Sequence, residues 1–255
     1  MKNTKYEFVP GDEIVIAPGR TLKRIRALVA ISCFASAGSL GGYVESEKSL
    51  DPTGNAWIYG DAWIYGDARI YGDAQIYGNA RISGNAQISG NAQISGDAWI
   101  YGDARIYGDA QISGDARIYG DAQIYGDAWI YGDAQISGDA QISGNARIYG
   151  DAQISGNAQI SGNAWIYGDA RIYGDAQIYG NSLIFWASKV GTENGTLTVY
   201  NTKDNTLEVT RGCFKGTVDE FLSASEKKHD EATHLEYRLL IEVAHSRITR
   251  ARNKP

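Results

Sequence analysis

The chain has 255 residues, of which 43% are hydrophobic and 11% aromatic, and its formal net charge is −6. This excess of acid argues against direct nucleic-acid binding, because phosphate groups are held by clustered Lys and Arg. The two cysteines, Cys33 and Cys213, are too few and too distant for a disulfide framework or a metal-binding motif. No segment approaches about eighteen consecutive apolar residues, and the first residues lack the apolar core of a signal peptide. We therefore expect a cytoplasmic protein that does not associate with membranes.

Residues 1–48 are expected to form a β-rich N-terminal cap. Tyr6 and Phe8 alternate with polar residues, a Pro-Gly pair marks a turn, and 22–28 can pair back on the first strand. The end of a stacked sheet exposes unpaired backbone groups, so a cap is needed whatever the function. We interpret the basic residues of this segment as a solvated strand face and not as a phosphate site; they are Arg20, Lys23, Arg24 and Arg26.

Residues 55–180 consist of twenty-one consecutive copies of one six-residue motif, Asp/Asn-Ala-Trp/Arg/Gln-Ile-Tyr/Ser-Gly, without an insertion. A hexapeptide period is typical of a parallel β-helix. Alternation places Ala and Ile inside and the variable residue and Tyr or Ser outside, while Gly and Asp or Asn form the corner. Three copies close one triangular coil, so the array predicts about seven coils. We assign 49–186 to this solenoid and include 181–186 as a decayed copy.

Residues 187–255 are expected to form a C-terminal cap of one β-hairpin and two helices. The hairpin is predicted at 196–200 and 206–210, where apolar residues alternate on either side of a turn-rich segment. Thr217 and Glu220 have the spacing of a capping box at the start of the first helix. The second helix carries apolar residues that we expect to pack on the hairpin, namely Leu235, Leu239, Val243 and Ala244.

In every copy an aliphatic residue is followed four positions later by a small one, as Ile58 is followed by Ala62. The array resembles the hexapeptide-repeat (isoleucine-patch) superfamily, and this resemblance implies a left-handed β-helix. A narrower resemblance covers 22–28 and the Gly-Gly-Tyr-Val-Glu-Ser-Glu segment at 41–47. These segments resemble those of enterobacterial and prophage hexapeptide-repeat proteins described as acyltransferases. The narrower resemblance implies an acyl-CoA-dependent acyltransferase with acetyl-CoA as cofactor.

Histidine is the residue on which catalysis would depend, because catalytic members of the superfamily use it as a general base or as a zinc ligand. The array contains none, and the copies follow one another without an insertion that could shape an acceptor pocket. The chain's three histidines, His229, His234 and His245, lie in the predicted C-terminal helices without the spacing of a helical metal pair. We expect no metal site and no catalytic residue. If the protein is an enzyme, these three histidines are the candidates.

The variable residues of every third copy form the three outer faces of the prism. The first face carries Trp57, Gln75, Gln93, Gln111, Trp129, Arg147 and Trp165. The second face carries Trp63, Arg81, Trp99, Arg117, Gln135, Gln153 and Arg171. The third face carries Arg69, Gln87, Arg105, Gln123, Gln141, Gln159 and Gln177.

We interpret only the second face as an alternation of aromatic and cationic side chains, at Trp63, Arg81, Trp99 and Arg117. Exposed Trp and Arg often dominate protein interfaces, which favours a recognition patch. Rungs about 4.8 Å apart can also form cation–π contacts, which favours a self-supporting ladder. Both interpretations stay open at this point.

Five aspartates recur at one corner of consecutive coils, namely Asp97, Asp115, Asp133, Asp151 and Asp169. Like charges at this spacing repel, so corner amides, flanking Arg or bound cations must offset them. Regular acidic rows also suggest a mimic of duplex DNA. That function would be inhibition of a nucleic-acid-binding enzyme.

The sequence therefore predicts a rigid solenoid scaffold of prophage or mobile-element origin. We expect it to form a homotrimer and to bind a protein partner through its outer faces, with no cofactor. The first alternative is the acyl-CoA-dependent acyltransferase, which would need acetyl-CoA. The second alternative is the acidic DNA mimic.

Overall fold

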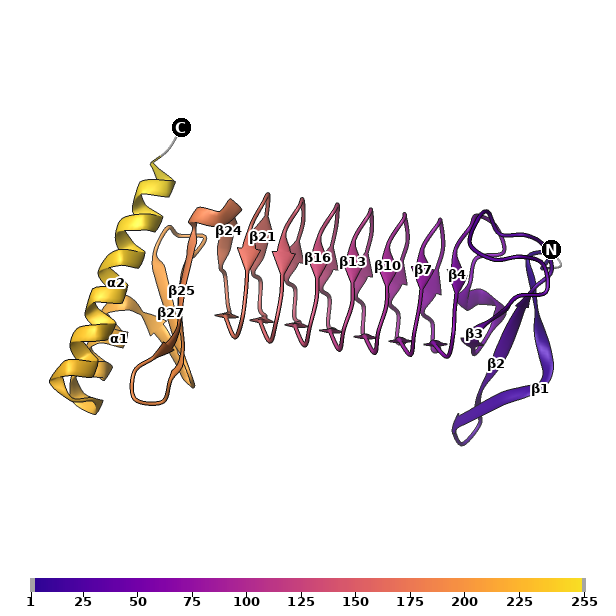
Figure 1. Cartoon of the computed structure of the whole chain (residues 1–255), viewed down its shortest axis with the longest axis horizontal. Helices are drawn as coiled ribbons and strands as arrows, with labels where there is room; N and C mark the ends of the chain where they lie inside the picture. The colour runs from indigo at the N-terminus through magenta and orange to yellow at the C-terminus, as the bar shows by residue number, and fades with distance from the viewer. Residues whose placement is uncertain (1–2, 254–255) are drawn as a thin grey trace.

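The computed structural model describes residues 3–253, which form an elongated rod (Figure 1). A parallel β-solenoid occupies the middle of the rod. Antiparallel strands cover its N-terminal end, and an antiparallel sheet with two helices covers its C-terminal end. The expected solenoid, with its β-rich N-terminal cap and its C-terminal hairpin and helices, is confirmed. No helix within residues 3–253 is long and apolar enough to cross a membrane.

Each hexapeptide contributes one short strand, and each face of the solenoid holds seven such rungs in parallel register. The rungs of the first face are β4 Trp57–Ile58, β7 Gln75–Ile76, β10 Gln93–Ile94, β13 Gln111–Ile112, β16 Trp129–Ile130, β19 Arg147–Ile148 and β22 Trp165–Ile166. Those of the second are β5 Trp63–Ile64, β8 Arg81–Ile82, β11 Trp99–Ile100, β14 Arg117–Ile118, β17 Gln135–Ile136, β20 Gln153–Ile154 and β23 Arg171–Ile172. Those of the third are β6 Arg69–Ile70, β9 Gln87–Ile88, β12 Arg105–Ile106, β15 Gln123–Ile124, β18 Gln141–Ile142, β21 Gln159–Ser161 and β24 Gln177–Tyr179.

The repeat Ala and Ile side chains fill the interior, as their alternation predicts. Ala116 and Ile118 are fully buried, and every other repeat Ala and Ile is at most 1% exposed. Backbone hydrogen bonds join each coil to the next. The amide of Trp99, for example, donates to the carbonyl of Ala116 at 2.9 Å, and that of Tyr101 donates to Ile118 at 3.0 Å. The apolar interior therefore leaves the strand backbone paired between coils.

The repeat glycines are required at the corners for two physical reasons. Each has a positive φ, between 60° and 79°, which other residues adopt only at a cost. Each corner before the last coil also lies directly against the corner of the next coil. A Cβ atom added at Gly114, for example, would lie 2.9 Å from the carbonyl oxygen and 3.0 Å from the nitrogen of Gly132. The glycine column therefore sets how closely successive coils approach.

The N-terminal cap extends one sheet of the solenoid beyond the repeats. β1 (Tyr6–Ala17) pairs antiparallel with β2 (Arg20–Ala27), which pairs antiparallel with β3 (Leu40–Val44). β3 then runs parallel to β5, so that it adds an eighth rung to the second face. After the short 3-10 helix η1 (Glu47–Ser49), Leu50 bridges Ile70 on the third face. The cap is thus a continuation of the coil as well as its cover.

The cap buries a tryptophan that the sequence placed on an outer face. Trp57 is fully buried and Tyr59 donates from its hydroxyl to the carbonyl of Phe34 at 2.7 Å. Gly41 allows the cap to cover Trp57, because a Cβ on Gly41 would lie 2.9 Å from the Trp57 ring. The exposed position predicted for Trp57 was wrong because the cap covers that part of the first face.

The C-terminal sheet begins directly after the last coil and the short 3-10 helix η2 (Gly180–Ser182). Its four antiparallel strands are β25 Ile184–Val190, β26 Gly195–Asn201, β27 Leu207–Arg211 and β28 Phe214–Thr217. The predicted hairpin is confirmed as β26 and β27. The decayed copy at 181–186 was wrongly assigned to the coil. Trp186 stands where a copy has its corner Gly, and the chain runs on into β25 without turning.

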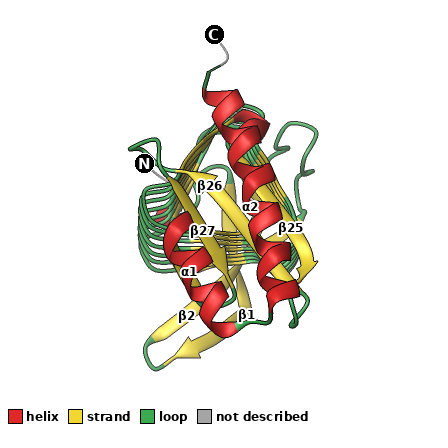
Figure 2. Cartoon of the chain, turned by 90° about the vertical axis from the view of Figure 1, so that its left-hand side faces the viewer, coloured by secondary structure: helices red, strands yellow, loops and turns green. Residues whose placement is uncertain are grey.

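Two helices pack on the outer side of this sheet, α1 (Val218–Lys228) and α2 (Glu231–Arg252) (Figure 2). The predicted capping box is confirmed, since Thr217 and Glu220 bond each other's backbone at the start of α1. The prediction of which apolar residues of α2 face the hairpin was largely wrong. Leu235, Leu239 and Val243 are exposed. The buried side of α2 is formed instead by Thr233, Tyr237, Ile241, Ala244 and Ile248.

Polar side chains of the C-terminal sheet satisfy the backbone of the last coil. The hydroxyl of Thr198 accepts a hydrogen bond from the amide of Arg171 at 3.2 Å, and the hydroxyl of Thr210 donates to the carbonyl oxygen of Arg171 at 2.6 Å. The hydroxyl of Tyr200 lies 3.1 Å from both the amide and the carbonyl oxygen of Tyr173. The exposed end of the coil is therefore paired largely with side chains, together with one isolated backbone bridge between Ala176 and Thr202.

The glycine column gives the first prediction. Gly114→Ala should lower the free energy of unfolding by about 2–4 kcal/mol, because it combines a positive φ with backbone overlap against Gly132. Gly180→Ala is the matched control, since its φ is also positive and no atom lies within 4 Å of the added Cβ. It should cost only about 1–2 kcal/mol. Urea denaturation measures both; equal costs would show that stacking adds nothing to the φ requirement.

Candidate interaction surface

The structure brings the four predicted residues of the second face into one stack. The guanidinium of Arg81 lies 4.7 Å from the centre of the Trp63 ring and 5.1 Å from that of Trp99. Arg117 lies 6.0 Å from Trp99 on its other side. Each contact is within cation–π range, so the side chains hold one another in place. We call Trp63, Arg81, Trp99 and Arg117 the second-face stack.

The N-terminal cap continues this column at its start. Tyr43 of β3 is the register partner of Trp63, and the guanidinium of Arg24 lies 4.2 Å from the Tyr43 ring. Arg24 also forms ion pairs of 3.0 Å with Asp12 and with Asp61. The column of aromatic and cationic side chains therefore begins in the cap, where carboxylates neutralise it.

The other basic residues of the cap are paired in the same way. Arg20 lies 3.0 Å from Glu45 and Lys23 lies 3.9 Å from Glu13, while Arg26 pairs with Glu7. These carboxylates occupy the donors that a phosphate would need. The basic cluster is therefore a solvated strand face with ion pairs, as the sequence suggested.

A second stack lies on the first face, where the sequence analysis did not identify one. The guanidinium of Arg147 lies 4.8 Å from the Trp129 ring and 5.4 Å from the Trp165 ring. The conclusion that only the second face alternates was therefore wrong. The signal was present in the sequence, because these three residues are consecutive in the first-face column. We call Trp129, Arg147 and Trp165 the first-face stack.

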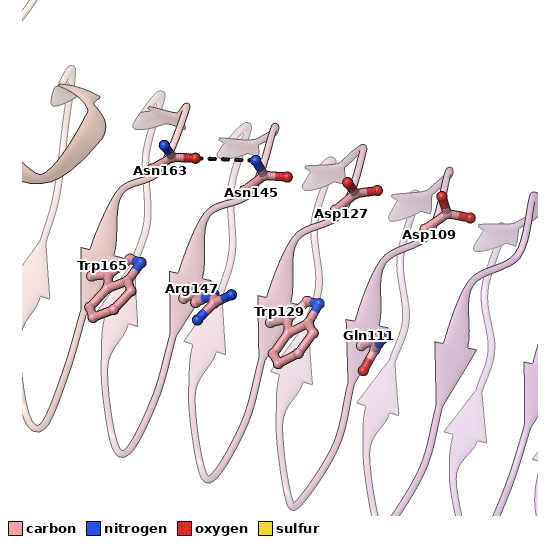
Figure 3. Close-up of a pocket in the computed structure, with 8 residues that line it drawn as sticks. All are labelled: Asp109, Gln111, Asp127, Trp129, Asn145, Arg147, Asn163 and Trp165. Carbon is pink, nitrogen blue, oxygen red and sulfur yellow. Dashed lines mark hydrogen bonds between the residues drawn. The ribbon is translucent and has the colours of Figure 1, made fainter.

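An open groove of about 640 Å³ runs along the first-face stack. Figure 3 shows the two indoles on either side of Arg147, with a parallel row of corner side chains beside them. Asp109 and Asp127 stand at one end of that row and Asn145 and Asn163 at the other. The amide of Asn145 donates to Asn163 at 3.1 Å. The groove thus offers aromatic rings, one cation, carboxylates and amides along a straight line.

Stacked tyrosines make the neighbouring outer positions rigid as well. Tyr131 lies parallel to Tyr149, with ring centres 5.4 Å apart, and Tyr149 lies parallel to Tyr167 at 5.0 Å. The Tyr131 hydroxyl donates to Gln111 at 3.0 Å. Burial and the nearby Tyr149 raise the pKa of Tyr131. The outer surface is therefore held by side-chain ladders as well as by its backbone.

The acidic corner columns are offset by amides only in part. Asn79 donates to Asp97 at 2.9 Å and Asn157 donates to Asp175 at 2.9 Å. In the corner column that runs from Asp97 to Asp169, burial and the neighbouring Asp133 and Asp169 raise the pKa of Asp151. Within residues 3–253, no three His, Cys, Asp or Glu side chains gather in a way that could hold a metal ion. Corner amides thus offset part of the charge, and at the two ends of the array Arg24 and Lys203 pair with Asp61 and Asp175. Repulsion persists where neither is present.

The three candidate histidines lie in the C-terminal unit and contact different neighbours. His229 ends α1, with its ring centre 5.6 Å from that of Tyr237. His234 places Nδ1 3.2 Å from the hydroxyl of Ser225, and His245 is exposed on α2. A cavity of about 100 Å³ lies beside His229. Both cysteines are free and exposed.

Comparison with known families agrees with the solenoid fold. A family model described as YdcK Beta solenoid repeat matches eight segments of the array, at 74–90, 86–102, 110–122, 122–138, 140–156, 152–166, 158–174 and 164–180. No curated protein matches the chain. These repeats are therefore similar to a known β-solenoid repeat, and the protein is a β-helix repeat protein. The resemblance to hexapeptide-repeat acyltransferases is not confirmed by this match.

The acidic column gives the second prediction. Asp151→Asn should raise the melting temperature slightly at pH 7, because it removes a carboxylate whose pKa is raised in the folded state. A raised acid pKa means that the folded chain binds the proton more readily, so ionisation destabilises it. The gain should therefore disappear as the pH falls through the raised pKa towards 3.8.

Asp175→Asn is the control with the opposite sign. Hydrogen bonds from Lys203 and Asn157 lower the pKa of Asp175, so its ionised form stabilises the fold above pH 3.8. The substitution should lower the melting temperature at pH 7, and the loss should vanish as the pH falls through the lowered pKa. Melting curves from pH 3 to pH 7 test both variants. A loss of stability at pH 7 for Asp151→Asn would contradict repulsion in the column.

Proposed function

We propose that this protein is a rigid interaction scaffold that binds a partner protein through its Trp–Arg stacks. The observation that carries the proposal is that large aromatic side chains are both exposed and fixed. Trp99 is 43% exposed and Trp165 is 41% exposed, yet each contacts a guanidinium in a neighbouring rung. Trp and Arg are the residues most often found to dominate binding free energy. A surface that is ordered before binding loses little side-chain entropy when the partner docks.

The extent of the stacks favours recognition over self-support. The second-face stack ends at Arg117 and is followed by Gln135, while the first-face stack begins at Trp129 after Gln111. The buried Ala and Ile interior is the same along the whole array. A ladder needed only for stability would have the same reason to occupy every rung. Two short patches, staggered along the rod on different faces, are better explained as two contact areas for a partner than as a stabilising ladder.

The third prediction separates binding from stability at the second-face stack. Trp99→Ala should abolish capture of the partner and leave the melting temperature within a few degrees, because the interior is unchanged. The measurement is cross-linked capture from a host lysate by the immobilised chain, read by mass spectrometry, together with thermal melting. Gln141→Ala, on an exposed rung of the third face, is the control and should change neither.

A structural ladder would give the reverse result for the same variant. Loss of the ring between Arg81 and Arg117 would then lower stability by about 1–2 kcal/mol through two cation–π contacts, and capture would persist. Trp165→Ala repeats the comparison on the first-face stack. Equal loss of capture for Gln141→Ala and Trp99→Ala would remove the special role of the stacks.

The fourth prediction addresses the acyltransferase alternative. A histidine base would have to act from the C-terminal unit, where His234 contacts Ser225 and His229 lies beside Tyr237. We expect no acyl transfer from acetyl-CoA to a broad panel of amines and alcohols. Transfer that is lost on His229→Ala, His234→Ala or His245→Ala would overturn the scaffold proposal. The DNA-mimic alternative is weakened by the amides that interrupt the acidic rows and by the arginines on the faces between them.

A further inference from the structure

An apolar stripe on α2 faces away from the rest of the chain. Leu235, Leu239 and Val243 follow one another at intervals of four residues and are 40%, 51% and 47% exposed. This spacing places them on one side of a helix. Exposed Ala232 and Ser246 extend the same side by one turn at each end. Isolated exposed leucines are ordinary, but a continuous stripe of this length marks a contact surface.

The position of α2 makes this stripe accessible from outside the rod. α2 packs on β25 and β26 through its opposite side, where Tyr237, Ile241 and Ile248 are buried. The helix lies at the outer C-terminal end of the rod, and it is seen in front of the sheet when the rod is viewed from that end (Figures 1 and 2). The stripe therefore points along the rod and away from the solenoid. No other part of the described chain covers it.

The charges along α2 indicate what could cover the stripe. The first half of the helix has a net charge of −1, from Glu231, Glu236 and Arg238. The second half has a net charge of +2, from Glu242, Arg247, Arg250 and Arg252. Two such helices in antiparallel alignment would place the acidic half of each beside the basic half of the other. Their helix dipoles would also oppose each other, which is favourable. Parallel alignment would instead bring like charges together. The surface is thus complementary to a second copy of itself.

We propose that two copies of this chain associate end to end through an antiparallel pair of α2 helices. The two-fold axis passes through the middle of the stripe, so that Leu239 meets its own counterpart. Leu235 then lies opposite Val243 of the second copy, and Ala232 lies opposite its Ser246. Small residues at both ends of the contact let the helices approach closely.

The same register creates a charge pair beside the stripe. Helical geometry places Glu242 and Arg238 of the second copy on the same flank of the stripe, about 3 Å apart along the helix axis, and the two-fold axis generates this pair twice. Within residues 3–253, neither Glu242 nor Arg238 forms an ion pair in its own chain, and both are exposed. Opposite charges flanking an apolar contact fix its register more than its strength.

The association is separate from partner binding by the Trp–Arg stacks. Both stacks lie on the sides of the solenoid, whereas α2 lies at its C-terminal end. A contact made mainly by one 22-residue helix is small compared with stable interfaces, so the dimer should dissociate in the micromolar range. The result is a rod of twice the length with both sets of stacks free.

Sedimentation equilibrium on the full chain over a range of concentrations tests this proposal. The wild-type chain should move from 27.7 kDa towards twice that mass as its concentration rises. Leu239→Asp should hold the mass at that of one chain, because it places two carboxylates against each other on the two-fold axis. The control is Val15→Asp, at a 73% exposed apolar position of the N-terminal cap, which should dimerise like the wild type. Circular dichroism confirms that each variant is folded.

A charge exchange tests the register independently of the apolar stripe. Arg238→Glu and Glu242→Arg should each weaken dimerisation at least tenfold, since each places like charges opposite one another. The double variant should restore it, because both pairs are present again with their signs reversed. A wild-type chain that stays monomeric, a limiting mass of three chains, or a Leu239→Asp variant that still dimerises would each overturn the proposal. None of these results depends on whether the Trp–Arg stacks bind a partner.

Discussion

Backbone stacked on backbone at the corners is the contact on which the rest of this structure depends. The corner glycines approach one another so closely that a Cβ atom added at Gly114 would overlap the backbone of Gly132. Each copy must therefore sit directly above its counterpart in the coil below. Once that alignment is fixed, any residue type that recurs in the sequence becomes a column in space. The Trp–Arg stacks, the tyrosine ladders and the aspartate rows all follow from this one constraint.

The two ends of the solenoid are closed in physically different ways. The N-terminal cap donates a further rung, and its Tyr6 and Ile25 belong to the same apolar core as the coils. The C-terminal sheet meets the last coil largely through hydroxyl groups, and with α1 and α2 it encloses a core of its own. The first end is thus part of the solenoid, whereas the second end adds Ile184 and Tyr200 to the solenoid core and is otherwise built around a core of its own. That separation is consistent with a role of its own for the C-terminal unit.

Residues that repeat strictly could be read from the sequence, and residues with unique environments could not. The buried Ala and Ile followed from the six-residue period alone. The burial of Trp57 depends on Gly41, a residue outside the array, so periodicity could not reveal it. On α2, Leu239 and Ile241 both belong to helically spaced apolar series, and only the position of the sheet decides which side is buried. The first-face stack follows from the same spacing as the second-face stack, because Trp129, Arg147 and Trp165 recur at intervals of eighteen residues.

The triangular coil also limits how the length of this array can change. Three consecutive copies make one complete turn, so adding or removing eighteen residues would leave every later side chain on its original face. Adding a single copy would instead rotate everything that follows by one face. Aromatic residues would then lie above residues from another column, and the C-terminal unit, bonded to the last coil through Thr198 and Tyr200, would turn with that coil relative to the N-terminal cap. Growth or shrinkage by duplication is therefore compatible with this surface only in whole turns.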